Sequence, residues 1–321
     1  MLRSIVRGLG LALGLSAAAT APALAAYPDK PVKIVVNFTA GGPLDIMARL
    51  IADRLNATFK QPFIVENRTG SGGNIGAAAV ANAAPDGYTV LFGLDSTFTV
   101  NPSLYSSLGF RLDQLKPVVR LASSGMLIAA HPSAKADTLK GLVDQGLRDA
   151  VTFSSAGNGS PGHLSLSMLS QATDMKINHI PYRGNAPAVL ALVSGEVQAA
   201  ALATPGLLQH VNAGTIKALA VTGSQRSPLL PSVPTTAELG YPAVKQDVLY
   251  VAMVPSGTPD GIVRTLQSAI GKILAQPDVQ QRLRAMDFTL ESLDGEAAAK
   301  ELAAVRERYA KIIKSAGMTV D

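Results

Sequence analysis

Two glycine-rich turns constrain the possible fold of this chain more than any other feature. The first, residues 39–45, follows the apolar run Val32–Phe38, and the second, residues 154–163, follows the apolar start of Val151–Ser154. Each turn separates a strand-like segment from a helix-like one, so each directs the N–H groups of a helix start beyond the end of a strand. Helix starts of this kind bind anions without a catalytic side chain. The pair predicts a small anionic ligand that is held from two sides.

The first 26 residues are expected to be a secretory signal peptide. Two arginines precede the apolar run Leu9–Ala19, and Ala23-Leu24-Ala25 matches a small-residue cleavage motif. The apolar run is shorter than a comfortable bilayer span, which argues against the alternative of a membrane anchor. The mature protein is therefore expected to be soluble and exported, with cleavage after Ala25 or Ala26.

The composition of the mature chain narrows the classes of function. Removal of the signal leaves 26 basic and 23 acidic residues, a net charge of about +3. There is no basic run and no tryptophan, so nucleic-acid binding has little support. The absence of cysteine excludes thiol catalysis, cysteine-type zinc sites and iron–sulfur ligation. Neither a metal nor a cofactor is expected.

Strand-like and helix-like segments alternate in two sets, which is typical of parallel sheets covered by helices. The strands expected in the first set are Val32–Phe38, Phe63–Glu66 and Tyr88–Leu94. Those expected in the second set are Val151–Ser154, Asn178–Pro181, Gln198–Leu202 and Ile216–Thr222. A short capped helix is expected at Pro234–Glu238, and longer helices are expected from Thr258 and from Gly295.

Two segments are expected to connect the sets. Val118–Leu121 and Met126–Ala130 are strand-like, and residues 122–125 between them are a candidate crossing between the two sets. Val248–Val254 is a second candidate crossing. This order predicts a bilobal α/β protein with a two-strand hinge and a ligand cleft at the carboxyl ends of the strands. The first lobe is expected to contain residues 27–122 and 224–321, and the second lobe residues 123–223.

A series of short motifs runs through the mature chain in a fixed order. They are Tyr27–Val36 with Gly41-Gly42 and Asp45, Glu66–Gly76, Pro85–Thr89, Ser155–Ser160 with His163-Leu164, Pro181–Gly184, Ala218–Thr222 and Pro255–Pro259. Each motif is weak alone, but the ordered series resembles the Bug family over essentially the whole mature chain. This family comprises the extracytoplasmic receptors of tripartite tricarboxylate transporters.

The resemblance implies a type II periplasmic binding protein fold, with two Rossmann-like lobes joined by a two-strand hinge. It implies a periplasmic, monomeric receptor that is not an enzyme. Such a receptor captures a dicarboxylate, a tricarboxylate, an acidic amino acid or an aromatic acid and delivers it to the membrane subunits of a transporter. Two alternatives stay open: a receptor of the same fold that senses its ligand for signalling, and a secreted α/β enzyme that acts on an acidic metabolite.

The resemblance also implies which residues surround the ligand. The first turn would hold a carboxylate, partly through ordered water, and the second turn would face it from the other lobe. The expected ligand-binding residues are Phe38, Thr39, Ala40, Gly41, Gly42, Asp45, Ser96, Thr97, Ser155, Gly157, Asn158, Gly159, Ser160, His163, Tyr182, Arg183, Ala203 and Thr204.

Several of these residues also have an interpretation that needs no ligand. Gly41-Gly42 suits a tight turn, and Asp45 stabilises a helix start in any case. His163 suits packing or a helix-start contact, and Arg183 suits a surface ion pair as well as a bidentate carboxylate clamp. The segment Gly70–Gly76 lacks the dinucleotide fingerprint and the P-loop Lys-Ser/Thr, so it is interpreted as a packing and turn device.

Four departures from the family pattern leave the identity of the carboxylate open. Asn37 stands where many members have proline, as Thr39 often does too, and Leu249 stands where many have an aromatic residue. The segment Ala201–Pro205 lacks an acidic residue that some members carry there.

Overall fold

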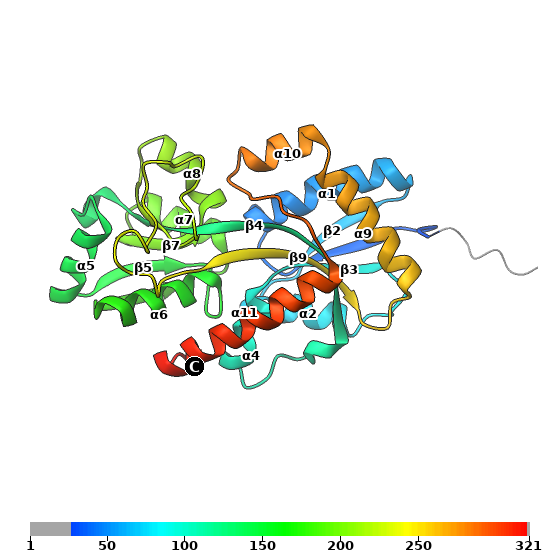
Figure 1. The fold of residues 1–321 in the computed structure, drawn as a ribbon, viewed down its shortest axis with the longest axis horizontal. Coiled ribbons are helices and arrows are strands. Elements are labelled where there is room, and N and C mark those ends of the chain that lie inside the picture. The colour runs from blue at the N-terminus through cyan, green and yellow to red at the C-terminus, as the bar shows by residue number, and fades with distance from the viewer. Residues whose placement is uncertain (1–26, 320–321) are drawn as a thin grey trace, which may run out of the picture.

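A curled ten-stranded sheet runs along the molecule, with helices packed on its faces (Figure 1). The structure is a computed structural model and describes residues 27–319; the expected signal peptide lies outside the described residues. The strands are β1 Val32–Val36, β2 Phe63–Asn67, β3 Thr89–Leu94, β4 Leu115–Ala130, β5 Val151–Ser155, β6 Ile177–Pro181, β7 Ala199–Ala203, β8 Lys217–Val221, β9 Asp247–Pro255 and β10 Leu293–Asp294.

The first lobe has the strand order β2-β1-β3-β9-β4. β1 pairs in parallel with β2 and β3, whereas β9 pairs antiparallel with β3. The apolar run of β1 is explained by burial on both faces. Ile34 packs with α1 (Pro43–Phe59) and α9 (Asp260–Leu274), and Val35 packs with α2 (Asn74–Ala81) on the other face. Such double burial is typical of parallel strands.

The second lobe repeats this arrangement around β5. β5 pairs in parallel with β6 and β7, and the end of β4 lies antiparallel between β7 and β8. One core contains side chains of α5 (Leu139–Arg148) and α6 (Pro161–Thr173), and another contains side chains of α7 (Asn185–Val193) and α8 (Thr204–Asn212). The carboxyl ends of the parallel strands in each lobe therefore lead into the glycine-rich turns and the following helices.

Within residues 27–319, three segments connect the two lobes. β4 is one uninterrupted strand whose first part pairs with β9 and whose last part pairs with β7 and β8. Residues 122–125, the expected crossing, are part of this strand, because Ala122 to Gly125 pair with residues 250 to 247 of β9 and stay extended. The third connection is α11 (Gly295–Ala316), with Leu302 in a core of the first lobe and Tyr309 in a core of the second. The expected lobe boundaries remain a prediction.

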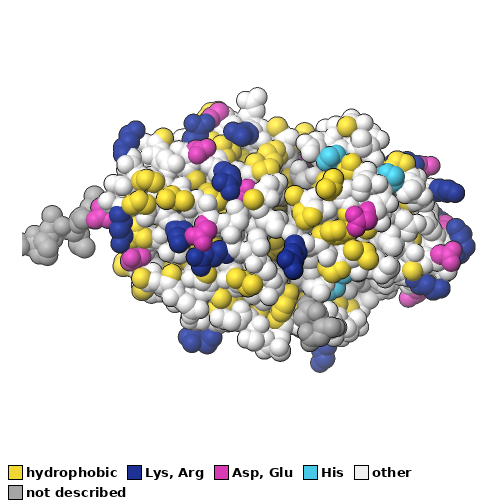
Figure 2. All heavy atoms as spheres, turned by 180° about the vertical axis from the view of Figure 1, so that it is seen from behind, with side chains coloured by type: hydrophobic (Ala, Val, Ile, Leu, Met, Phe, Trp, Pro, Cys, Tyr) yellow, Lys and Arg dark blue, Asp and Glu magenta, His cyan; other side chains and the backbone are white. Residues whose placement is uncertain are grey.

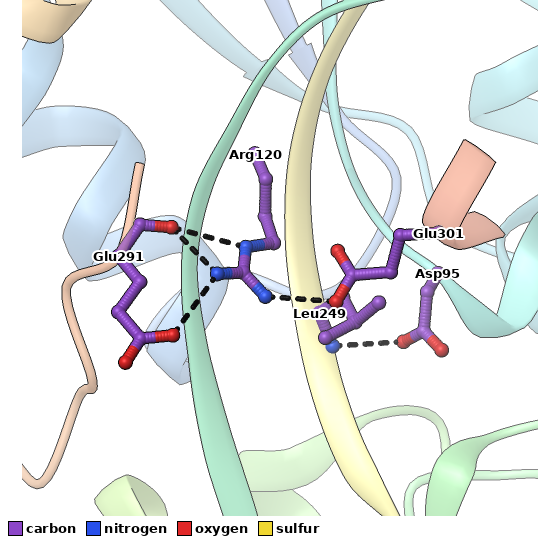
Figure 3. Close-up of polar contacts among 5 residues, drawn as sticks. All are labelled: Asp95, Arg120, Leu249, Glu291 and Glu301. Atoms are coloured by element: carbon purple, nitrogen blue, oxygen red, sulfur yellow. Dashed lines mark hydrogen bonds and ion pairs between the residues drawn. The ribbon is translucent and has the colours of Figure 1, made fainter. Parts of the chain in front are cut away.

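Polar contacts fix both crossing strands to the first lobe (Figure 3). The guanidinium of Arg120 on β4 is buried and donates hydrogen bonds to the carbonyl oxygen of Glu291 at 2.6 and 3.1 Å and to Oε1 of Glu301 at 2.9 Å. On β9, the N–H of Leu249 donates to Oδ1 of Asp95 at 3.0 Å. Buried charges are costly unless they are paired, so these contacts hold the crossing strands in place.

Residues 236–240 form a turn that follows a β-bridge at Thr235, so the short helix expected at Pro234–Glu238 is wrong. The N–H of Thr235 donates to Glu238 Oε2 at 2.7 Å, and the N–H of Glu238 donates to Thr235 Oγ1 at 3.1 Å. These are the reciprocal bonds of a capping box, which the sequence predicts correctly. A parallel β-bridge between Thr235 and Val221 pairs this segment with the sheet, so the backbone is extended where it enters the turn.

The remaining helical segments are short. They are Ser71–Gly73, α3 Ser96–Thr99, α4 Asn101–Leu104, Leu112–Gln114, Pro132–Ala134 and α10 Pro277–Arg284. Within residues 27–319, no helix is long and apolar enough to cross a membrane. On the face shown in Figure 2, basic and acidic side chains are interspersed.

Candidate ligand-binding site

Two cavities lie where the lobes meet, and we call them the inner and the outer cavity. The inner cavity, of about 40 Å³, is lined by Phe38, Thr39, Gly42, Pro43, Leu44, Leu94, Met126, Ala156, Pro161, Gly162, Asn185, Ala201, Leu202, Ala203, Val248 and Tyr250. The outer cavity, of about 510 Å³, is lined by Asn37, Phe38, Thr39, Thr69, Gly70, Ser71, Gly72, Gly73, Ile75, Tyr105, Ala156, Gly157, Asn158, Pro181, Tyr182, Arg183 and Gly184. The two share Phe38, Thr39 and Ala156.

Four helix starts converge on the inner cavity. Gly42 and Pro43 belong to the start of α1, Pro161 to that of α6, Asn185 to that of α7 and Ala203 to that of α8. Three of these helices have proline in the first turn, where its missing N–H costs nothing. Each helix start carries a partial positive charge. The cavity is therefore electropositive, although every residue that lines it is uncharged.

The wall of the inner cavity that faces the crossing strands is apolar. It is formed by Leu94 of β3, Met126 of β4, and Val248 and Tyr250 of β9. The hydroxyl of Tyr250 lies 3.1 Å from Ser124 Oγ, and burial raises the pKa of Tyr250, so the phenol stays neutral. This wall suits the apolar body of a ligand.

Thr39 provides a polar group in the wall shared by the two cavities. Its Oγ1 is buried and has no hydrogen-bond partner among residues 27–319. Buried polar groups are nearly always hydrogen-bonded in folded proteins. The hydroxyl of Thr39 is therefore available to a ligand or an ordered water.

The outer cavity carries one charged side chain. Arg183 is exposed and forms no ion pair within the described part of the chain. The hydroxyl of its neighbour Tyr182 donates to Glu196 at 2.6 Å, and burial together with Glu196 raises the pKa of Tyr182 to about 12. The hydroxyl of Tyr105, from the first lobe, donates to the carbonyl of Asn158 in the second at 3.1 Å. The two lobes thus touch directly around this cavity.

The turn at Gly70–Gly73 also lines the outer cavity, which the sequence interpretation as a packing device did not include. It is nevertheless tightly packed. The side-chain amide of Asn37 donates to the carbonyl of Gly73 at 3.3 Å, and that of Asn101 donates to the carbonyl of Gly72 at 2.9 Å. Gly72 and Gly73 have φ of +60° and +91°, a region that favours glycine. Asn37, one of the family departures, therefore supports this turn.

The structure brings part of the expected ligand-binding set together at the cavities. The residues that line them are Phe38, Thr39, Gly42, Gly157, Asn158, Tyr182, Arg183 and Ala203. The other expected residues, which line neither cavity, are Ala40, Gly41, Asp45, Ser96, Thr97, Ser155, Gly159, Ser160, His163 and Thr204.

Asp45 supports the first turn from behind. It is buried, and its carboxylate accepts hydrogen bonds of 3.0 Å from the N–H of Gly41, from Asn67 and from Arg49. Burial alone raises the pKa of Asp45, but the bonds from Arg49, Gly41 and Asn67 outweigh it and lower the pKa below its usual value. Asp45 thus organises the turn that ends at Gly42.

Two expected threonines and a serine also lie behind the cavities. Thr97 donates its hydroxyl to the carbonyl of Gly72, and Thr204 donates to the carbonyl of Gly125, both at 3.0 Å. Ser96 is fully buried, and its Oγ has no partner among the described residues.

The polar side chains of the second turn mostly bind one another. Ser155 Oγ lies 2.7 Å from Nε2 of His179, and Ser160 Oγ caps α6 by accepting from the N–H of His163 at 3.4 Å. Nδ1 of His163 accepts from the N–H of Gly159 at 3.3 Å. His163 stacks on His179 with ring centroids 4.6 Å apart. Burial lowers the pKa of both histidines to about 4, so both are neutral at pH 7.

Several cavity residues escaped the sequence analysis. Met126 and Tyr250 lie on the crossing strands, and which face of those strands points to the cavity depends on a register that no local pattern reveals. The sequence does contain an indication for Asn185, because this residue directly follows the Tyr182–Gly184 segment and begins a helix. Among residues 27–319, no group of three or more His, Cys, Asp or Glu side chains is placed to hold a metal ion.

The two lobes, the connecting strands and the electropositive cavity between them define a solute-binding protein of the two-lobed periplasmic type. Residues 47–318 match the model of the tripartite tricarboxylate transporter family receptor, and the chain belongs to this family. It is 34% identical to the protein BugT of Bordetella pertussis, over 91% of this chain and 90% of BugT.

Solved structures of similar proteins share the fold. One is an R. palustris protein with adipate, which is 31% identical with a TM-score of 0.87 over 91% of this chain and 98% of that one. Another is MatC from Rhodopseudomonas palustris with bound malate, which is 29% identical with a TM-score of 0.85 over 89% of this chain and all of that one.

Proposed function

We propose that this protein binds a small carboxylate in the inner cavity, in the periplasm, and delivers it to the membrane subunits of a tripartite transporter. The observation that carries the proposal is the convergence of four helix starts, from both lobes, on one cavity without a charged side chain. Helix starts stabilise a carboxylate through backbone N–H groups and the helix dipole.

The similar proteins support a carboxylate as the bound anion. The R. palustris structure contains adipate, and MatC contains malate. Both anions have carboxylate groups that suit helix starts. The inner cavity, about 40 Å³, accommodates a carboxylate group, and the outer cavity, about 510 Å³, which shares Phe38, Thr39 and Ala156 with it, accommodates the rest of the ligand.

The mechanism follows from contacts between the lobes. A carboxylate that touches α1 in the first lobe and α6 in the second stabilises the closed arrangement over an open one. Tyr105 and Asn158 already join the lobes in this structure. The protein acts as a monomer that leaves its ligand chemically unchanged, and the membrane subunits recognise the closed form.

Identification of the natural ligand tests this function. The mature protein is purified without added solutes, the bound compound is identified by mass spectrometry, and its binding is measured by calorimetry together with a panel of carboxylates. The expected result is a carboxylate that binds and is recovered unchanged. Chemical turnover of that compound, or the absence of binding by any carboxylate, contradicts the proposal.

A further inference from the structure

We infer that the site formed by the two cavities selects carboxylates that have no ammonium group, and so excludes amino acids. This inference rests on the proposed function, because it assumes that the ligand carboxylate lies at the helix starts. The remainder of the ligand begins at the wall formed by the crossing strands and by α8 and extends into the outer cavity.

The side chains of that wall are uncharged and mostly apolar. Leu94, Met126, Val248 and Ala203 present only apolar side chains, and the Tyr250 phenol stays neutral. The remaining polar side chains of the lining are those of Thr39 and Asn185, which are also neutral. An ammonium group in this cavity therefore meets no carboxylate of the lining.

The carboxylates nearest to the site in sequence are those of Asp45, Asp95 and Asp247. Asp45 is held by Gly41, Asn67 and Arg49 behind the first turn. Asp95 accepts from the N–H of Leu249 at 3.0 Å. Asp247 precedes the cavity residue Val248 on β9, and neighbouring side chains of a strand point to opposite faces. None of these three residues belongs to the lining of either cavity.

The electrostatic potential of the site favours a carboxylate over an ammonium group. The four helix starts that attract a carboxylate repel an ammonium group, and Arg183 adds a positive charge at the outer cavity. A buried charge without a partner loses its hydration and regains little. An apolar group, by contrast, gains by leaving water against Leu94, Met126 and Val248. Of two ligands that differ only in an amino group, the site therefore binds the one without that group more tightly.

The test compares such pairs by calorimetry on the mature protein. The pairs are glutarate and glutamate, adipate and 2-aminoadipate, and butyrate and 2-aminobutyrate. In each pair that binds, the member without nitrogen is expected to bind at least tenfold more tightly. Equal or tighter binding of the amino acid overturns the inference and leaves the carboxylate proposal intact. If no member of any pair binds, the carboxylate proposal fails, and the inference fails with it.

A substitution in the wall gives a second readout. Ala203 is the N-cap of α8 and lines the inner cavity. Because aspartate is a favourable N-cap residue, Ala203→Asp is compatible with the fold. The variant is expected to reduce the preference for the nitrogen-free member by at least tenfold. Ala299→Asp, on the exposed face of α11, is the matched control and keeps the wild-type preference. An unchanged preference in well-folded Ala203→Asp contradicts the inference.

Discussion

At the scale of single residues, most polar side chains of the two turns shape the site from behind rather than line it. Asp45 holds the N–H of Gly41, and Ser155 and Ser160 bind His179 and the start of α6. Short polar residues near glycine are equally consistent with ligand contact and with turn support. Family resemblance and composition identify the turn, but only the hydrogen-bond partners separate these two roles.

The stacked pair His163 and His179 predicts a dependence of stability on pH. The pKa of each is about 4 in the folded protein, below the value of about 6.5 for unfolded histidine. As the pH falls from 6.5 toward 4, the unfolded chain takes up protons that the folded protein does not, so the free energy of unfolding decreases.

His179→Gln is expected to reduce this loss, because it removes one of the two groups and keeps a polar partner for Ser155. Between pH 7 and pH 5 the wild type should lose about 2 kcal/mol more stability than the variant in urea unfolding. His210→Gln, on α8, serves as the control and should behave like the wild type. Identical pH profiles for His179→Gln and the wild type are the contrary result.

Gly42 marks the point where the first turn reaches the inner cavity. A Cβ at this position meets only ordinary contacts, 3.4 Å from the carbonyl of Thr39 and 3.7 Å from Cβ of Asn185. Gly42→Leu therefore folds but fills the cavity, and calorimetry is expected to show at least a hundredfold loss of carboxylate affinity. Gly261→Leu, in the first turn of α9 with open space around it, is the control and retains affinity. Retained binding by Gly42→Leu means that the ligand lies elsewhere.

At the scale of elements, the sequence predicts the parallel strands better than the crossing strands. The apolar runs of β1 and β3 reflect burial on both faces, and the proline at the start of α1 marks a helix terminus. Ser123, Ser124 and Gly125 are small residues of the kind typical of turns, so the sequence alone does not show that the strand-like runs on either side of them form one strand. They remain extended in β4 because β9 pairs with them along the whole crossing.

Arg120 is the side chain that most firmly anchors β4. Arg120→Ala leaves the partly buried carboxylate of Glu301 without its partner and is expected to cost about 3 kcal/mol of unfolding free energy. Urea unfolding measures this loss. Lys140→Ala removes an exposed ion pair with Asp144 on α5 and should change stability little. A loss for Arg120→Ala as small as that of the control would show that this ion pair does not anchor the strand.

At the scale of the whole molecule, both cavities depend on contacts between lobes that are far apart in sequence. Thr39 and Gly184 approach each other so closely that a Cβ on Gly184 would lie 2.0 Å from Thr39 Oγ1. The division into two α/β lobes can be predicted from the alternation of strand-like and helix-like segments in the sequence. The identity of the wall residues is not, because it depends on how far the lobes close and on the register of β4 and β9.

Lobe closure predicts an effect of Tyr105 on affinity. Tyr105→Phe removes the hydrogen bond to Asn158 that joins the lobes and is expected to weaken carboxylate binding roughly fivefold, as one lost hydrogen bond of about 1 kcal/mol predicts. Tyr27→Phe removes a hydroxyl that donates to the carbonyl of Gly87 at 2.7 Å within the first lobe, so it is the matched control and should bind like the wild type. Equal effects of the two variants in calorimetry are incompatible with a role of Tyr105 in closure.

The central claim is that a carboxylate binds between the helix starts of the two lobes. A crystal structure of the mature protein with the carboxylate that binds most tightly tests it most directly. The predicted result places the carboxylate oxygens in the inner cavity, about 3 Å from backbone nitrogens at the starts of α1 and α6. A carboxylate bound only to Arg183 in the outer cavity, or outside both cavities, would contradict the claim.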